Sequence, residues 1–359
     1  MKDLLATLGA RRGRRRDLEL VIRYSEGTPR EAEAYRSGCG VVLLETRSPV
    51  FLRGADRMRF LHGQCTNHVR SLHPGDSKEA LVLDNKGRGL GHIRYLVGEE
   101  EILVQADRLQ VTDLLAHWRR FLVIEEVEIT EASEEAVLFL VGGPTSHEVL
   151  ASTLGLSGGP EPPPHRVPMG SDEVLLWPQD EGGGPGHGVL VPTASATRFL
   201  ERVLAHGGKP VGFDAFQALR IAAGRPWFGV DFGPECLPLE TGLEEECVAY
   251  DKGCYLGQEQ VAHQKHRGRP RRMVRAMIFD EDTGEASEPP APGDEVFLEG
   301  ASAGDLRSFA GPPIVPRPVG LALLRGAPES GLEAEVRPAA GGSPLRARVC
   351  ALQELRSSW

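Results

Sequence analysis

The sequence predicts an α+β protein that ends in a small all-β module. Three observations support this fold class. Strand patterns alternate with helices and hairpins between residues 40 and 223, a Gly/Pro-rich stretch at 157–164 interrupts them, and only strand patterns follow an acidic, proline-rich stretch at 280–293. Because 359 residues exceed the usual size of one core, two or three domains are expected.

The first half of the chain shows strands and helices in turn. Apolar patterns predict strands over 40–44, 49–53, 79–83, 89–97, 101–105, 125–129 and 137–141. A tight turn at 84–87 marks a hairpin between the third and fourth of these. Helices are predicted over 55–62, from Asp107 onward with its apolar positions on one face, and from Pro144.

The second half begins with the break at 157–164. Strands are predicted over 173–177 and 189–191, separated by a glycine-rich run at 181–188 that we interpret as a flexible linker. Helices follow over 193–206 and 213–223, each ending at glycine. Beyond the break at 280–293, strands are predicted over 295–298, 320–324 and 347–353, which indicates a small β-barrel.

Composition narrows the class of protein. Hydrophobic residues make up 40% and charged residues 26% of the chain, as in soluble globular proteins, and the longest apolar runs are too short for a membrane span. A net charge of −10 argues against a general nucleic-acid coat. Six cysteines without a Cys-x-x-Cys pair indicate a reducing, cytoplasmic setting. We expect the basic segment 1–34 to be a partly disordered arm.

The most informative segment is the block 252–259, called the signature segment below. It reads Lys252, Gly253, Cys254, Tyr255, Leu256, Gly257, Gln258 and Glu259. A helix is expected to begin at Gly257, which would place Cys254 near its N-terminus, where the helix dipole and nearby cations favour a reactive thiolate. The equally weighted alternative is a tight turn that contains a buried cysteine.

Two further patterns accompany the signature segment. A basic stretch follows the signature segment. It either binds a phosphate, a carboxylate tail or RNA, or forms a solvated loop that pairs with the acids at 280–282. Its cations are Lys265, Arg267, Arg269, Arg271, Arg272 and Arg275. The cysteines and histidines between 236 and 266 match no tight zinc pattern and are too sparse for an iron–sulfur cluster held by this chain alone. The alternative is an iron–sulfur cluster that this chain shares with a partner protein, with Cys254 as one ligand.

The signature segment resembles that of the YgfZ proteins, folate-binding relatives of the glycine-cleavage aminomethyltransferase (the YgfZ/GcvT family). Matches in the same order occur at 53–56, 60–67, 72–75, 84–88, 212–226, 237–240, 303–308 and 319–324. The resemblance therefore covers about residues 35 to 330.

The resemblance implies an aminomethyltransferase-like ring of two α+β lobes and a C-terminal β-barrel around a tetrahydrofolate-sized pocket. It implies a first folate-binding-like lobe at 35–156, a second lobe with the signature segment at 157–279, and the barrel at 280–359. Asn67, Arg220 and Glu240 are the candidate cofactor-binding residues. Arg220 could reach a folate tail, although we favour a surface or structural role for it.

The implied function is accessory work in iron–sulfur cluster assembly or repair, with an effect on tRNA modification, through the thiol of Cys254. Implied partners are iron–sulfur proteins or assembly factors and tRNA; the protein is expected to be a monomer away from membranes. The alternative is a tetrahydrofolate-dependent aminomethyltransferase or demethylase. Two departures argue against it, because Leu90, Gly91 and His92 replace an acidic pair and 184–188 lacks the expected carboxylates.

Overall fold

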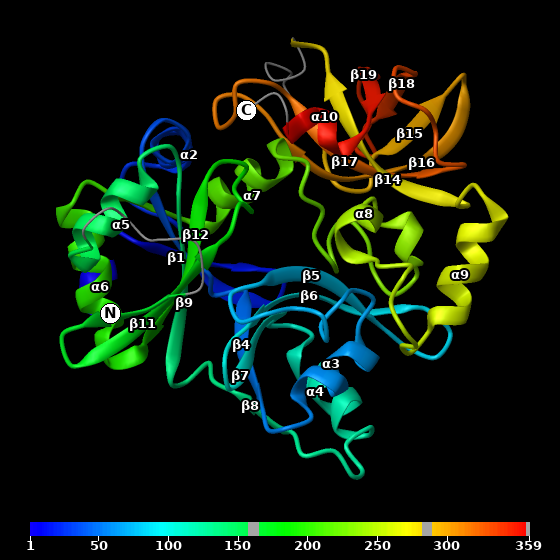
Figure 1. Ribbon diagram of the computed structural model, residues 1–359. Coiled ribbons are helices and arrows are strands. Elements are labelled where there is room, and N and C mark those ends of the chain that lie inside the picture. The colour runs from blue at the N-terminus through cyan, green and yellow to red at the C-terminus, as the bar shows by residue number, and fades with distance from the viewer. Residues whose placement is uncertain (157–164, 282–288, 357–359) are drawn as a thin grey trace.

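The computed structural model describes residues 1–156, 165–281 and 289–356. Two mixed lobes and a closed barrel are arranged around a common centre (Figure 1). This arrangement confirms the predicted fold class. None of the helices in the described residues combines the length and the apolar character needed to cross a lipid bilayer.

The first lobe is an antiparallel five-stranded sheet with the order β5-β6-β7-β4-β8. Its strands are β4 (Arg47–Arg53), β5 (Ser77–Leu83), β6 (Gly89–Val97), β7 (Glu101–Asp107) and β8 (Glu128–Glu131). Helices α3 (Arg57–Gln64) and α4 (Val111–Arg119) pack on one face, where Leu61 and Trp118 are fully buried. Alternate side chains of a strand lie on opposite faces of the sheet. Leu81 and Leu83 of β5 therefore lie on the other face, where they belong to a different hydrophobic core.

The second lobe is a six-stranded sheet with the order β10-β11-β12-β9-β3-β13. Its strands are β3 (Gly40–Leu43), β9 (Ala136–Gly142), β10 (His165–Met169), β11 (Asp172–Pro178), β12 (Gly186–Pro192) and β13 (Lys209–Val211), of which β13 pairs parallel to β3. Val41 contacts the core beneath α5 (Ser146–Leu154) and α6 (Thr193–Ala205), whereas its neighbour Val42 contacts the core beneath α2 (Thr28–Ser37) and α7 (Phe213–Ala222). Helices therefore cover both faces of this sheet.

The barrel closes in the order β14-β17-β16-β15-β18-β19. Its strands are β14 (Arg272–Phe279), β15 (Glu295–Leu298), β16 (Ala301–Ala310), β17 (Val319–Arg325), β18 (Glu333–Arg337) and β19 (Leu345–Cys350), followed by the short helix α10 (Leu352–Arg356). The interior is apolar, since Met277, Leu306 and Val349 are fully buried in it. A closed barrel leaves no free strand edge.

A connecting segment joins the barrel to the first lobe. It contains the short 3-10 helix η1 (Pro238–Glu240), α8 (Glu244–Cys247) and α9 (Gln258–Arg267) (Figure 1). The signature segment lies after α8, and its last two residues begin α9. Leu81 of β5, Tyr255 of the signature segment and Leu321 of β17 belong to one hydrophobic core. This shared core fixes the signature segment between the two bodies.

The N-terminal segment is ordered, so the predicted disordered arm at 1–34 is wrong. It forms α1 (Lys2–Thr7) and the hairpin of β1 (Arg11–Arg15) and β2 (Leu18–Arg23). Leu20 is 1% exposed, and Arg16 pairs with the buried carboxylate of Asp107 at 2.7 Å. Distant acids pair with three of the basic residues of the hairpin, because Arg12 pairs with Glu45, Arg15 with Asp214 and Arg16 with Asp107. Local sequence could not identify these partners.

The lobes also divide the chain differently from the predicted boundaries. Strands β3 and β9 lie before residue 157 but belong to the second lobe, and β14 lies before residue 280 but belongs to the barrel. The glycine-rich run at 181–188 is no flexible linker: a Cβ atom on Gly182 would meet the Tyr35 hydroxyl at 2.3 Å, and β12 begins at Gly186. The lobe boundaries differ because strands pair across long sequence separations, which local patterns do not display.

Candidate functional site

Lys252 anchors the signature segment to the first lobe. Its ammonium donates hydrogen bonds to the carbonyl oxygens of His62 at 2.7 Å, Cys65 at 2.7 Å and Asn67 at 2.6 Å. These carbonyls lie at and just beyond the C-terminal end of α3, where backbone acceptors lack helical partners. Burial lowers the pKa of Lys252 to about 8. The three donors of the ammonium are thus engaged in holding the segment.

Gly257 lets the start of α9 touch the β5–β6 hairpin. Its φ is +83°, and a Cβ atom there would lie 2.7 Å from the carbonyl oxygen of Asp84. On the facing turn, a Cβ atom on Gly87 would lie 2.6 Å from Cβ of Gln260. The helix begins at Gln258, directly after Gly257, as predicted. Gly253 is different, because a Cβ atom on it would meet its nearest neighbour at 4.0 Å.

Cys254 lies exposed on the turn between these two attachments, whereas the other five cysteines are buried. The next residue, Tyr255, is 9% exposed and packs into the shared core, and the backbone N–H of Leu256 donates to the carbonyl oxygen of Gly63 at 3.1 Å. The predicted alternative of a buried signature cysteine is therefore wrong. A firmly attached turn presents the thiol to solvent.

Two of the cations expected to activate Cys254 interact with other groups. Lys252 is directed to the carbonyls of the first lobe, and Lys265 pairs with Glu244 at 2.7 Å beside the ring of Tyr250. Of the signature residues, Gln258 and Glu259 lie in the first turn of α9, with Glu259 exposed. Solvent accessibility distinguishes this thiol from those of the other five cysteines.

The basic stretch borders a groove of mixed charge. Arg269 pairs with Glu329 at 3.1 Å, and Arg272 pairs with Glu240 at 3.2 Å. The groove has a volume of about 540 Å³, and its charged lining consists of Glu235, Glu240, His263, Arg269, Arg271, Arg272 and Arg325. The described backbone places Arg267 at the end of α9. Within the described residues, the acids that pair with this stretch are Glu240, Glu244 and Glu329; of the acidic run expected to pair with it, Asp282 lies outside the described residues.

The three candidate cofactor residues make different kinds of contact. Asn67 donates its amide N–H groups to the carbonyl oxygens of Glu79 at 2.8 Å and Glu246 at 2.7 Å. Glu240 accepts from the backbone N–H of Leu237 at 3.0 Å and borders the mixed groove. Asn67 and Glu240 thus form hydrogen bonds with backbone groups of the connecting segment.

Arg220 is buried rather than on the surface. Its guanidinium pairs with the fully buried Asp231 at 2.6 Å and donates to the Ser308 hydroxyl of the barrel at 3.2 Å. It also lines the central cavity, unlike the other two candidates. Its contacts join α7 of the second lobe to the barrel, so of the expected surface or structural role they support the structural one.

The central cavity is much smaller than the resemblance implied. Its free volume is about 20 Å³, roughly the space of one water molecule. Opposite charges close it, with Arg47 paired to Glu181 at 3.1 Å and Arg225 paired to Asp180. Sites for drug-sized ligands measure about 300–1,000 Å³. The side chains leave too little free space at the centre for a tetrahydrofolate, so the expected pocket of that size is corrected.

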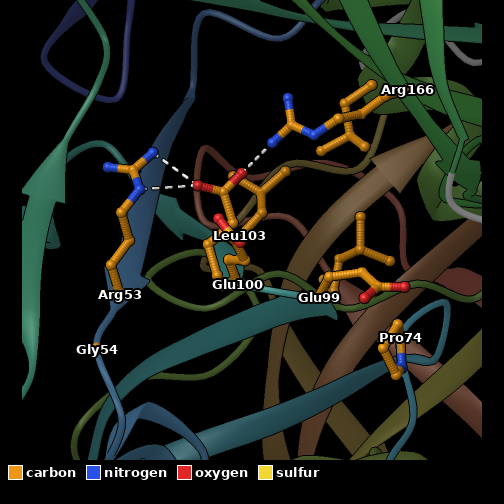
Figure 2. A pocket seen from close by; sticks show the side chains of 11 residues that line it. Arg53, Gly54, Pro74, Glu99, Glu100, Leu103 and Arg166 are labelled. Carbon is orange, nitrogen blue, oxygen red and sulfur yellow. Dashed lines mark hydrogen bonds and ion pairs between the residues drawn. The ribbon is translucent and has the colours of Figure 1, made fainter.

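A large cleft lies between the two lobes. Its volume is about 800 Å³, and β4, β7 and β10 contribute to its lining. Figure 2 shows Arg53 and Arg166 on opposite sides of it, both joined to one carboxylate, that of Glu101. This carboxylate bridges the lobes. None of the predicted site residues lines the cleft.

Three residues near the centre, of which His92 and Cys247 are buried and Glu79 is half-buried, could not be grouped from sequence patterns. Glu79 of β5, His92 of β6 and Cys247 of α8 bring a carboxylate oxygen, a ring nitrogen and a sulfur within 4.8 Å of one another. The hairpin register gives part of this group, because Glu79 faces Arg94 and Leu81 faces His92. The third member comes from 155 residues further along the chain. No local pattern could have supplied it.

Comparisons with known proteins identify the family. Residues 1–158 match the family model described as the GCVT N-terminal domain. The tRNA-modifying protein YgfZ of Sodalis glossinidius is 30% identical over 262 residues, which cover 72% of this chain and 76% of that protein. The aminomethyltransferase of Rubrobacter xylanophilus is 28% identical over 339 residues, which cover 93% of this chain and 87% of that enzyme. The chain spans 66% of one chloroplastic relative from Arabidopsis thaliana.

A solved structure agrees on the fold. The glycine cleavage system aminomethyltransferase T of Bartonella henselae superposes with a TM-score of 0.86 at 19% sequence identity, covering 98% of this chain and 95% of that one. This structure shows the aminomethyltransferase fold, and the match to the GCVT N-terminal domain together with the 30% identical relative shows that the chain belongs to the GCVT-domain family. Its relatives include both aminomethyltransferases and a YgfZ protein.

Proposed function

We propose that this protein is a YgfZ-like accessory factor in iron–sulfur cluster assembly or repair, and that it acts through the thiol of Cys254. One observation carries the proposal: of the six cysteines, Cys254 is the exposed one, on a turn anchored through Lys252 and Gly257. An accessible thiol on a fixed backbone can reach a cluster, or a cysteine, on the surface of another protein. The partners are iron–sulfur proteins or their assembly factors.

The experiment is a Cys254→Ser substitution in cells that lack the endogenous protein. We expect the activity of iron–sulfur enzymes to fall, while a matched His266→Gln variant, altered on exposed α9, keeps wild-type activity. Protein levels are measured for both variants. Normal enzyme activity at normal levels of the Cys254→Ser protein would contradict the role given to this thiol.

The second candidate function is tetrahydrofolate-dependent aminomethyl transfer or demethylation. The aminomethyltransferases among the relatives favour it, because they cover up to 93% of the chain. The closed central cavity speaks against it. Titration calorimetry with tetrahydrofolate and an assay for methylenetetrahydrofolate formation decide between the two. Turnover would establish the transferase, whereas absence of binding would exclude it and leave the proposal for Cys254 standing.

A tRNA contact at the basic stretch is the remaining part of the proposal. Arg269 is 79% exposed in its side chain and is therefore accessible to a phosphate. Charge reversal at Arg269, Arg271 and Arg272 should remove retention of tRNA at low salt. If the wild-type protein retains no tRNA at low salt, this contact is refuted, and the test of Cys254 is unaffected.

A further inference from the structure

A second chemical centre lies beneath the central cavity, apart from Cys254. Glu79 and His92 line the cavity, and Cys247 lies behind them at the end of α8 with no exposed surface. The Nε2 atom of His92 is 3.0 Å from Oε2 of Glu79 and 3.6 Å from Sγ of Cys247. Three potential ligand atoms thus converge on one small volume.

The geometry excludes a catalytic relay. In a cysteine–histidine–carboxylate relay, one ring nitrogen faces the nucleophile and the other faces the carboxylate. Here both the thiol and the carboxylate face Nε2. One nitrogen can donate a single proton or accept one, so it cannot serve a thiol donor and a carboxylate acceptor together. A metal ion satisfies all three atoms, because each offers it a lone pair.

The two separations from Nε2 of His92 suit a zinc ion, and all three ligand atoms lie within 4.8 Å of one another. Bond lengths of about 2.3 Å to sulfur and about 2.0–2.1 Å to nitrogen place the two ligand atoms about 3.5 Å apart at a tetrahedral angle. The Sγ–Nε2 distance is 3.6 Å. The Oε2–Nε2 distance of 3.0 Å requires an opening of only a few tenths of an ångström.

Neighbouring side chains already hold the ligands in position. Arg94 binds Oε1 of Glu79, which leaves Oε2 facing the histidine. The Thr66 hydroxyl donates to the carbonyl oxygen of Cys247 at 2.6 Å, and the Asn67 amide joins the backbone of Glu79 to that of Glu246. Such outer contacts orient the ligands in known metal sites.

We propose that Glu79, His92 and Cys247 bind one zinc ion, with a water molecule as the fourth ligand on the side of the central cavity. The cavity volume of about 20 Å³ suits one water. Thiolate and carboxylate charges balance the charge of the ion, and binding releases the thiol proton to solvent. The site extends between β5, β6 and α8, so the metal joins the first lobe to the connecting segment. Asn67 acts as a positioning residue.

Cobalt(II) is the probe that tests the site. The purified full-length protein is stripped with a chelator and titrated with Co²⁺, which reports a thiolate ligand by a near-ultraviolet charge-transfer band and four-coordination by visible bands. We expect one equivalent to bind and Zn²⁺ to displace it. Cys247→Ser and His92→Gln should each weaken binding by at least about 100-fold. Cys236→Ser and Cys254→Ser, at a buried and an exposed control cysteine, should retain both bands.

A thermal measurement provides an independent readout. Zn²⁺ should raise the unfolding temperature of the wild-type and control proteins but not of Cys247→Ser, because a ligand that binds the native state stabilises it. Glu79→Gln repeats the test if Cys247→Ser does not fold. Absence of a thiolate band in the wild-type protein, or its persistence in Cys247→Ser, would overturn the proposal.

Discussion

Replacement of Lys252 by methionine tests whether this side chain anchors the signature segment. The substitution keeps the apolar stem and removes the ammonium from three carbonyl oxygens at 2.6–2.7 Å. Hydrogen bonds to a charged group contribute about 1.5–3 kcal/mol each, and the burial of the ammonium offsets several kcal/mol of their sum. We expect a net loss of about 2–4 kcal/mol in the free energy of unfolding.

The assay combines thermal unfolding with amide hydrogen exchange. For a chain of 359 residues, the expected loss lowers the unfolding temperature by roughly 3–5 °C. Exchange should accelerate at 62–67 and 251–257, the two segments that Lys252 joins. The matched control is Lys265→Met, since Lys265 is half exposed and its pair with Glu244 is worth less than about 1 kcal/mol. Unfolding within about 1 °C of wild type, with unchanged exchange, would refute the anchoring role.

Three more substitutions test other contacts. Burial, and next the charge of Lys252, lower the pKa of His62 to about 4. As the pH falls, the unfolded chain therefore takes up this proton before the folded protein does, and the stability of the fold decreases from about pH 6.5 to pH 4. His62→Asn should flatten that part of a urea-unfolding series, and an unchanged slope would contradict the assignment. Gly257→Ala should lower the free energy of unfolding in urea by about 2–4 kcal/mol and Gly268→Ala by only about 1 kcal/mol. Both glycines have positive φ, but only at Gly257 would the added Cβ atom meet backbone atoms. Equal losses would rule out the close approach. Arg220→Met should cost about 3–5 kcal/mol because it leaves a buried carboxylate unpaired, and adding Asp231→Leu should recover much of that loss; no recovery would show that the pair is not the cause.

Local sequence was sufficient where a pattern of neighbouring residues determines structure. The turn at 84–87 fixed the β5–β6 hairpin, the glycine at 257 marked the beginning of α9, and strand patterns after residue 293 gave the barrel. The ordered motifs around the signature segment gave the family. Each depends on backbone preferences or spacing within a few residues, which one sequence displays directly.

Tertiary structure decided how these elements combine. Strands β3 and β9 pair with strands far along the chain, and the basic N-terminal segment is ordered by acids such as Asp107 and Asp214. Lys252, expected to activate a thiol, holds three carbonyls instead. Glu79, His92 and Cys247 meet from three separate elements. Sequence determined which residue types were available; only long-range pairing and burial determined which side chains are accessible and which converge on a common site.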